Sequence, residues 1–251
     1  MMKVVCEMDY ILLYFIGMAA MTLGTLAGGG GLITMPAMLL MGIPIHSVIG
    51  AGKISTTVSS FSTFLMVLLK KQITFKESFW IIPASLTGGL TGGFIATRLT
   101  ESTMYTVAIV LLIFAFLTSF FSKADFTGME DLRPTKIAIP GLVGIGMYDG
   151  LFGPGQGTVL LYLFNHLRIA YVRAIGFVRL ATFSSGFGAA ISYIYMGKVI
   201  WPIAFALMAG LLSGAQIGVC LAEKLNPKYV KILLRFVTVA LILQLIMNSI
   251  L

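Results

Sequence analysis

The chain has 251 residues, of which 58% are hydrophobic and only 10% are charged, and its formal net charge is +8. Soluble globular proteins carry about 25% charged residues, so this composition excludes soluble enzymes and soluble binding modules and indicates an integral membrane protein. The basic excess fits the Lys and Arg residues that gather in cytoplasmic loops of membrane proteins, and nucleic acid is not an expected partner. Cys6 and Cys220 form no CxxC pair, so no metal site or other cofactor is predicted.

Apolar segments along the chain predict an all-α, polytopic protein of the cell membrane. In chain order they fall at about residues 10–27, 31–42, 47–69, 77–97 and 103–121, and then at 137–151, 156–167, 171–195, 201–222 and 229–250. About eight to ten membrane-embedded helical segments are therefore expected, at about 20 residues per crossing. We divide the chain into an N-terminal repeat at 1–121, a polar cytoplasmic linker at 122–136 and a C-terminal repeat at 137–251.

Two glycine clusters interrupt these apolar segments. The first is the unbroken run Gly28–Gly31, and the second is Gly153-Pro154-Gly155-Gln156-Gly157. A run of glycines destabilises a helix by about 1 kcal/mol per residue relative to alanine. Such a run therefore favours a turn within the membrane, where glycine lets a second backbone or a ligand approach closely.

The two clusters belong to a longer internal repeat. A shift of 126 residues places Gly29 on Gly155 and Lys53 on Arg179. The same shift aligns Gly24 with Gly150, Gly31 with Gly157, Gly50 with Gly176, Thr56 with Thr182, Ser59 with Ser185, Gly88 with Gly214, and Gly92 with Gly218. Membrane composition explains matched leucines, but it does not explain matched glycines together with a matched cation. The sequence therefore predicts a duplication.

The charged loops predict that the two halves have opposite orientations. In the first half, the basic loop joins the third and fourth segments, whereas in the second half it joins the fourth and fifth. The residues concerned are Lys70, Lys71 and Lys76 in the first half and Lys224, Lys228 and Lys231 in the second. Because basic loops face the cytoplasm, this exchange indicates an inverted repeat, an arrangement that places transporter substrates near the midplane between the halves.

The second segment of each half is too short to cross the membrane. Residues 31–42 and 156–167 would form helices of about 18 Å at 1.5 Å per residue, against a hydrocarbon core of about 30 Å. We expect broken or re-entrant hairpins with their glycine turns at mid-depth. One hairpin would enter from each side, so that the two turns meet near the centre.

The meeting of two helix N-termini favours an anion-binding site. The first N–H groups of a helix lack intrahelical partners, and that end carries a partial positive charge. The competing interpretation is that the glycines only permit tight helix packing. That interpretation fits the later pairs Gly88/Gly92 and Gly214/Gly218, whereas the two clusters are longer than packing requires.

Lys53 and Arg179 are the expected cations of this site. Each lies inside an apolar segment, where a charged side chain costs about 2.5–3.5 kcal/mol and usually faces a partner or a water path. Either side chain could instead extend to the nearer membrane surface. A bound anion could supply the counter-charge, and a role in proton transfer or in pairing with Arg179 or Arg173 is open to Asp149.

Neutral donors complete the predicted site. Thr56 and Thr182 lie about one turn from the two cations, and Gln156 lies within the second cluster. The predicted substrate-binding residues are Lys53, Arg179, Gly28, Gly29, Gly30, Gly31, Gly155, Gln156, Gly157, Thr56 and Thr182, with no catalytic or metal-binding residue.

These motifs resemble the TauE/SafE sulfite exporter family. The resemblance lies in the first glycine cluster followed by Pro36, in Gly42-Ile43-Pro44 and Gly50-x-x-Lys53, and in their repetition through Gly176 and Arg179. It covers nearly the whole chain. It implies a permease for sulfur-containing oxyanions such as sulfite or an organosulfonate such as sulfoacetate, with transport usually directed out of the cell. Pro154, Gln156 and Lys53 depart from the pattern expected of the family.

The leading hypothesis is therefore export of a small sulfur oxyanion by alternating access around the two glycine turns. An anion channel, or a permease for another small anion, is the main alternative. A membrane-embedded enzyme is disfavoured because no Cys/His pair, Ser/His pair or acid dyad is predicted at depth. A purely structural subunit is the remaining alternative. The expected partners are the oxyanion or sulfonate substrate, the lipid bilayer and a second copy of the chain in a homodimer.

Overall fold

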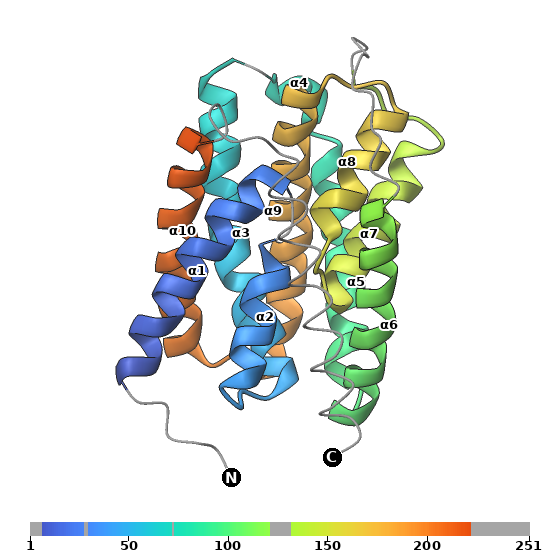
Figure 1. The fold of residues 1–251 in the computed structure, drawn as a ribbon. Helices are drawn as coiled ribbons and strands as arrows, with labels where there is room; N and C mark the ends of the chain where they lie inside the picture. The colour runs from blue at the N-terminus through green and yellow to red at the C-terminus, as the bar shows by residue number, and fades with distance from the viewer. Residues whose placement is uncertain (1–6, 28–29, 72, 121–131, 222–251) are drawn as a thin grey trace.

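The computed structural model describes residues 7–27, 30–71, 73–120 and 132–221, which form a bundle of helices (Figure 1). Every regular element in these ranges is helical, which confirms the all-α prediction. The elements are α1 Glu7–Ala27, α2 Gly31–Leu40, α3 Ile45–Leu69, α4 Phe75–Ser78, α5 Ile81–Arg98, α6 Glu101–Phe120, α7 Ala138–Leu151, α8 Gln156–His166, α9 Tyr171–Tyr195 and α10 Trp201–Leu221. The segment predicted at 229–250 and most of the 122–136 linker lie outside the described residues.

Several described helices are long and apolar enough to cross a membrane. Five spans meet that requirement within the described ranges: Met8–Thr25, Ile45–Leu69, Phe75–Arg98, Arg173–Tyr195 and Trp201–Gly218. The prediction of a polytopic membrane protein is thereby confirmed. The expected short segments are also present, because α2 has 10 residues and α8 has 11, or about 15–17 Å of helix.

The two hairpins differ in their first arms. Helix α7 has 14 residues, about 21 Å, so both arms of the α7–α8 hairpin are shorter than the membrane core. Helix α1 has 21 residues and is long enough to cross on its own. In Figure 1 the short helix α2 occupies the lower part of the bundle and α8 the upper part. The two hairpins thus approach the centre from opposite ends.

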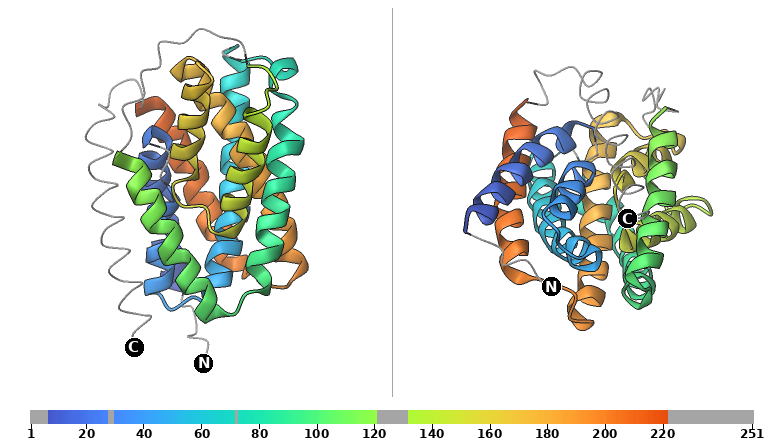
Figure 2. Two further views of the ribbon diagram at one scale, coloured as in Figure 1. Left: turned by 90° about the vertical axis from the view of Figure 1, so that its right-hand side faces the viewer. Right: turned by 60° about the horizontal axis from the view of Figure 1, so that its bottom comes forward.

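Helices α3 and α9 form the centre of the bundle and pack against each other. Figures 1 and 2 show α1 and α10 on one side of this pair and α5 and α7 on the other. The most extensive contacts join α1 to α10 and α5 to α7 or α9. Each hairpin therefore packs through its first helix against the fourth segment of the other predicted half, so the two halves interlock.

Glycines make these interhelical contacts close. A methyl group at Gly88 or Gly92 of α5 would overlap the backbone of α7, and one at Gly214 of α10 would overlap the backbone of α1 at Met18. At Gly218 the same group would lie 2.8 Å from Thr25 Cβ. The prediction that these glycine pairs serve packing is confirmed.

Replacing Gly92 with alanine should destabilise the protein, because the α5 and α7 backbones must separate to admit the methyl group. Overpacking of this kind typically costs about 1–3 kcal/mol. We expect a clear drop in the thermal unfolding midpoint of the detergent-solubilised protein. The matched control is Gly144→Ala in α7, where the added group meets no described atom within 4 Å. Equal midpoints for the two variants would contradict the packing assignment.

The backbone itself repeats at the offset seen in the sequence. Helix α9 begins and ends 126 residues after α3, at Tyr171 and Tyr195 against Ile45 and Leu69. The positive-φ residues that follow helices agree as well: Gly42 (φ 78°) matches Arg168 (φ 57°), and Lys71 (φ 56°) matches Gly197 (φ 64°). These equivalences support the duplication. The orientation of the halves in a membrane, and the domain limits drawn from it, stay predictions.

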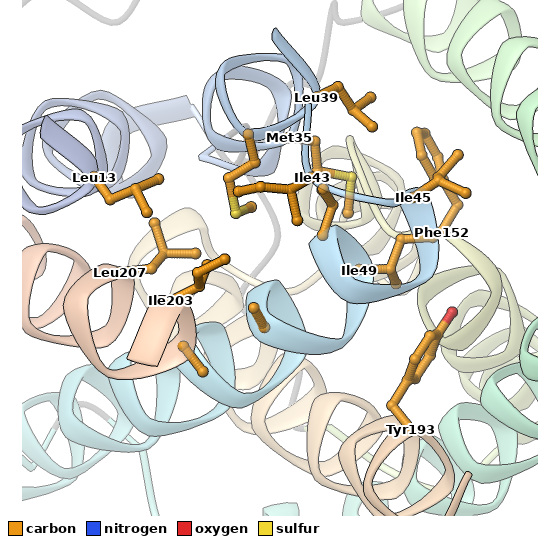
Figure 3. Packing of buried hydrophobic residues seen from close by; sticks show 14 of the residues in the cluster. Leu13, Met35, Leu39, Ile43, Ile45, Ile49, Phe152, Tyr193, Ile203 and Leu207 are labelled. Carbon is orange, nitrogen blue, oxygen red and sulfur yellow. The ribbon is translucent and has the colours of Figure 1, made fainter. Parts of the chain in front are cut away.

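Buried apolar side chains form two clusters. Cluster 1 joins α1, α2, the first turns of α3 and α10 (Figure 3). Cluster 2 joins the last turns of α3, the start of α5, α8 and the first half of α9. Met21, Met35, Phe152 and Leu211 of cluster 1, and Val178 of cluster 2, also line the cavity described next. The polar site thus lies between two apolar layers.

Candidate functional site

The two hairpin turns meet at a small cavity of about 80 Å³, lined by both polar and apolar residues. A methyl group added at Gly31 would lie 3.8 Å from Pro154 Cα, so the two turns approach each other closely enough for one extra carbon atom to bridge them. The lining comes from both hairpins and from the central helices: Met21, Gly24, Gly30, Gly31, Thr34, Met35, Gly52, Lys53, Thr56, Ser60, Asp149, Phe152, Gly153, Pro154, Gly155, Gln156, Gly157, Val178, Arg179, Thr182 and Leu211. The structure thus gathers most of the predicted site residues around one cavity.

Helices α2 and α8 both begin at this cavity. Gly30 is the N-cap of α2 and Gly155 is the N-cap of α8, and neither helix has a side-chain cap. Gly155 has φ 84°, a left-handed conformation that favours glycine. The main-chain amides of Gln156 and Thr158 already donate to the carbonyl oxygens of Gly153 and Gly155, and that of Ile33 donates to the carbonyl oxygen of Gly30. Both helix starts therefore contribute to the cavity chiefly the partial positive charge of a helix N-terminus.

Lys53 and Asp149 form a buried ion pair in the cavity wall. Lys53 Nζ lies 2.6 Å from Asp149 Oδ1, and the two side chains are 5% and 6% exposed. Helix α9 packs against both α3 and α7, so a long lysine side chain on α3 reaches the carboxylate on α7. Removing either partner would leave the other charge buried and uncompensated.

The ion pair adds a partner that the sequence did not predict. The sequence suggested Arg179 or Arg173 as the partner of Asp149 and a bound anion as the counter-charge of Lys53. Asp149 pairs with Lys53, and Arg173 Nη2 lies 2.5 Å from Glu77 Oε2 on α4. Sequence distance concealed the Lys53–Asp149 pairing, because the two residues lie 96 positions apart. Binding of an anion by Lys53 stays a prediction.

A hydrogen-bonded chain extends from the second oxygen of Asp149. Ser185 donates its hydroxyl to Asp149 Oδ2 at 2.7 Å, and Gln156 Nε2 donates to Ser185 Oγ at 3.1 Å. Thr182 donates to Gln156 Oε1 at 3.3 Å. The role of Ser185 was not predicted, although its alignment with Ser59 is visible in the sequence. These hydrogen bonds link the start of α8 to α9, and Ser185 and Thr182 thereby fix the orientation of the Gln156 side chain.

Arg179 is the residue of the second half that corresponds to Lys53 in the first half. It lines the cavity, is 8% exposed, and its Nη2 lies 3.5 Å from the carbonyl oxygen of Gly24. The shift of 126 residues relates Arg179 to Lys53 and Asp149 to Leu23. The carboxylate that pairs with Lys53 therefore has no carboxylate equivalent at the related position in the first half. Among the described lining residues, two cations and one acid leave a formal excess of one positive charge.

The remaining predicted residues divide into three groups. Gly30, Gly31, Gly155 and Gly157 line the cavity at the two helix starts. Thr56 also lines it and donates to the carbonyl oxygen of Gly52 at 2.7 Å. Gly28 and Gly29 lie outside the described residues. Whether any of these residues binds substrate stays a prediction.

Gly153, in the second glycine turn, lies directly against the Lys53–Asp149 ion pair. Its φ is 100°, and a methyl group there would overlap Lys53 Nζ and lie 2.7 Å from Asp149 Oδ1. We expect Gly153→Ala to lower thermal stability and to weaken anion binding, because the ion pair and the turn cannot both keep their places. Gly42→Ala is the matched control: its φ is 78°, and the added group meets no described atom within 4 Å. Equal loss of stability in both variants would show that backbone strain at positive φ, and not the clash with the ion pair, causes the destabilisation.

Comparisons with known proteins agree on one family. The family model described as "Sulfite exporter TauE/SafE" matches residues 13–245. A probable membrane transporter protein, ORF9 of Sinorhizobium sp, is 30% identical over 247 residues, covering 96% of this chain and 94% of that protein. The probable membrane transporter protein YfcA of Escherichia coli K12 is 25% identical, covering 94% and 89% respectively. No solved structure gives a significant match.

These findings agree with the apolar spans of the bundle. The family match extends over both predicted halves and across both glycine clusters. The relatives are aligned over most of their own length, so the similarity concerns whole proteins. The chain belongs to the TauE/SafE family and is a multi-pass membrane transporter.

Proposed function

We propose that the protein transports a small sulfur oxyanion, and that the cavity between the hairpin turns is its binding site. The observation that carries the proposal is that two helix N-termini without side-chain caps begin at one cavity whose described lining has a positive excess. Helix N-termini and an arginine fork both suit the oxygens of an oxyanion. Arg179 would supply the main charge–charge contact, and the partial positive charges at the N-termini of α2 and α8 would add to it.

The size of the cavity favours a small anion. Its volume of about 80 Å³ is far below the roughly 300–1,000 Å³ of pockets that hold drug-sized ligands. Sulfite matches both this volume and the description of the family. An organosulfonate such as sulfoacetate would require the cavity to widen.

Alternating access would follow from the placement of the site between the two apolar clusters. Movement of the hairpins relative to α3 and α9 would open one apolar layer at a time, as in transporters with inverted repeats. A membrane potential negative inside favours exit of an anion by about 2.3 kcal/mol per charge per 100 mV. Export therefore requires no second driving ion.

The test is flux of radioactive sulfite in liposomes that contain the purified protein. A transporter gives saturable uptake and accelerated exchange when unlabelled sulfite is present on the opposite side. Flux that rises linearly with concentration and shows no exchange would favour the anion channel. If another small oxyanion gives flux and sulfite does not, the proposed substrate is wrong, whereas the proposed binding site still stands.

A further inference from the structure

Asp149 holds the positive charge of Lys53 away from the ligand space. Its Oδ1 accepts from Lys53 on α3, and its Oδ2 accepts from Ser185 on α9. Among the described ionisable groups, Arg179 lines the same cavity, and the phenol of the neighbouring Tyr148 donates to the carbonyl oxygen of Pro154. The α5 helix, which also packs on α7, has a single charged residue, Arg98, at its last position.

The formal charge of the cavity depends on the proton of Asp149. With Asp149 ionised, the described lining residues carry a net charge of +1, which balances a monovalent anion. A divalent anion would leave one negative charge in the cavity without a counter-charge, which is strongly unfavourable. Protonation of Asp149 would release Lys53 and raise the lining charge to +2, which balances a divalent anion.

The surrounding hydrogen bonds fit both states of the carboxyl group. Lys53 and Asp149 both line the cavity, so the ammonium group can turn from the carboxylate to a ligand within the same space. A protonated carboxyl group still accepts through its other oxygen. Ser185 can therefore keep its bond to Oδ2, supported by Gln156.

We infer that Asp149 couples anion binding to a proton: when a divalent oxyanion binds, Lys53 moves to the anion and Asp149 takes up one proton from water. This inference rests on the proposed function, because it concerns the charge of the same site. Each divalent anion would then move with one proton, whereas a monovalent anion would move alone. Affinity for a divalent anion should rise as pH falls, by up to about tenfold per pH unit for one linked proton.

The experiment counts protons by titration calorimetry in buffers of different ionisation enthalpy. Sulfite is added to the purified protein at a pH alkaline enough for free sulfite to be divalent. The wild type should take up close to one proton per sulfite, and Asp149→Asn should take up none. Glu77→Gln is the matched control, since Glu77 is paired with Arg173 rather than lining the cavity, and it should behave like the wild type.

Two outcomes would overturn the inference. In one, the wild type binds sulfite without proton uptake. In the other, Asp149→Asn still takes up a proton, which means that the proton travels on the anion. If the variant does not fold, methanesulfonate provides the comparison in the wild type, because this monovalent ion should bind without proton uptake. Failure of sulfite to bind would count against sulfite as the substrate.

In that case, proton uptake would be compared between binding of divalent sulfate and binding of monovalent methanesulfonate.

Discussion

Arg179→Ala should abolish saturable sulfite flux and weaken sulfite binding by at least about tenfold. The substitution removes the positive excess of the described cavity lining and a guanidinium that can hold an oxyanion through paired hydrogen bonds. Hydrogen bonds to charged groups contribute about 1.5–3 kcal/mol each, which sets this minimum. Arg179→Lys keeps the charge but loses the fork, so we expect intermediate affinity. Binding is measured by calorimetry and flux in liposomes.

The matched control for this prediction lies on the same helix. Arg173 is also an arginine of α9, but it pairs with Glu77 and does not line the central cavity. Arg173→Ala should therefore preserve sulfite affinity. If Arg179→Ala retains wild-type affinity and flux, the anion is held elsewhere, and the role given to Arg179 is wrong.

Breaking the Lys53–Asp149 pair from one side should destabilise the protein strongly. Removal of one partner of a buried ion pair costs about 3–5 kcal/mol, because the remaining charge lies uncompensated. We expect Lys53→Met and Asp149→Leu each to lower the thermal unfolding midpoint markedly. The double variant should recover most of that loss, since replacing both charges by apolar groups of similar volume is often neutral or stabilising.

The double-variant comparison separates stability from function. Midpoints are measured in detergent without added anion. The double variant should be stable yet should lose the proton uptake linked to divalent anions. A double variant as unstable as the sum of the single ones would show that the two residues act independently, and the ion pair would then not be the reason for their burial.

Much of the fold was predictable because membrane helices leave strong local signals. Apolar runs located the helices within a few residues, and α9 has the predicted limits of 171 and 195. The two glycine clusters marked the starts of α2 and α8, because glycine runs are incompatible with a stable helix interior. The aligned cations Lys53 and Arg179 pointed to one buried site, and both line the same cavity.

The partners within the site could not be predicted from local sequence. The Lys53–Asp149 contact depends on how two interlocked halves pack around α9, and no sequence spacing expresses that. The duplication also suggested equivalent roles for Lys53 and Arg179, although only Lys53 has the acid of the other half beside it in an ion pair. The repeat has Leu23 in the first half where the second half has Asp149, so the carboxylate that pairs with Lys53 has no counterpart at the related position. Ser185 became important only once Asp149 was seen beside it.

The most direct test of the site is to locate the anion itself. Crystals soaked in selenite, a heavier analogue of sulfite, allow selenium to be found by anomalous diffraction. We predict a selenium peak between the N-termini of α2 and α8, within hydrogen-bonding distance of Arg179, that weakens when sulfite is added in excess. A selenium peak only at the protein surface, with none in this cavity, would contradict the proposal that the two glycine turns form an anion-binding site.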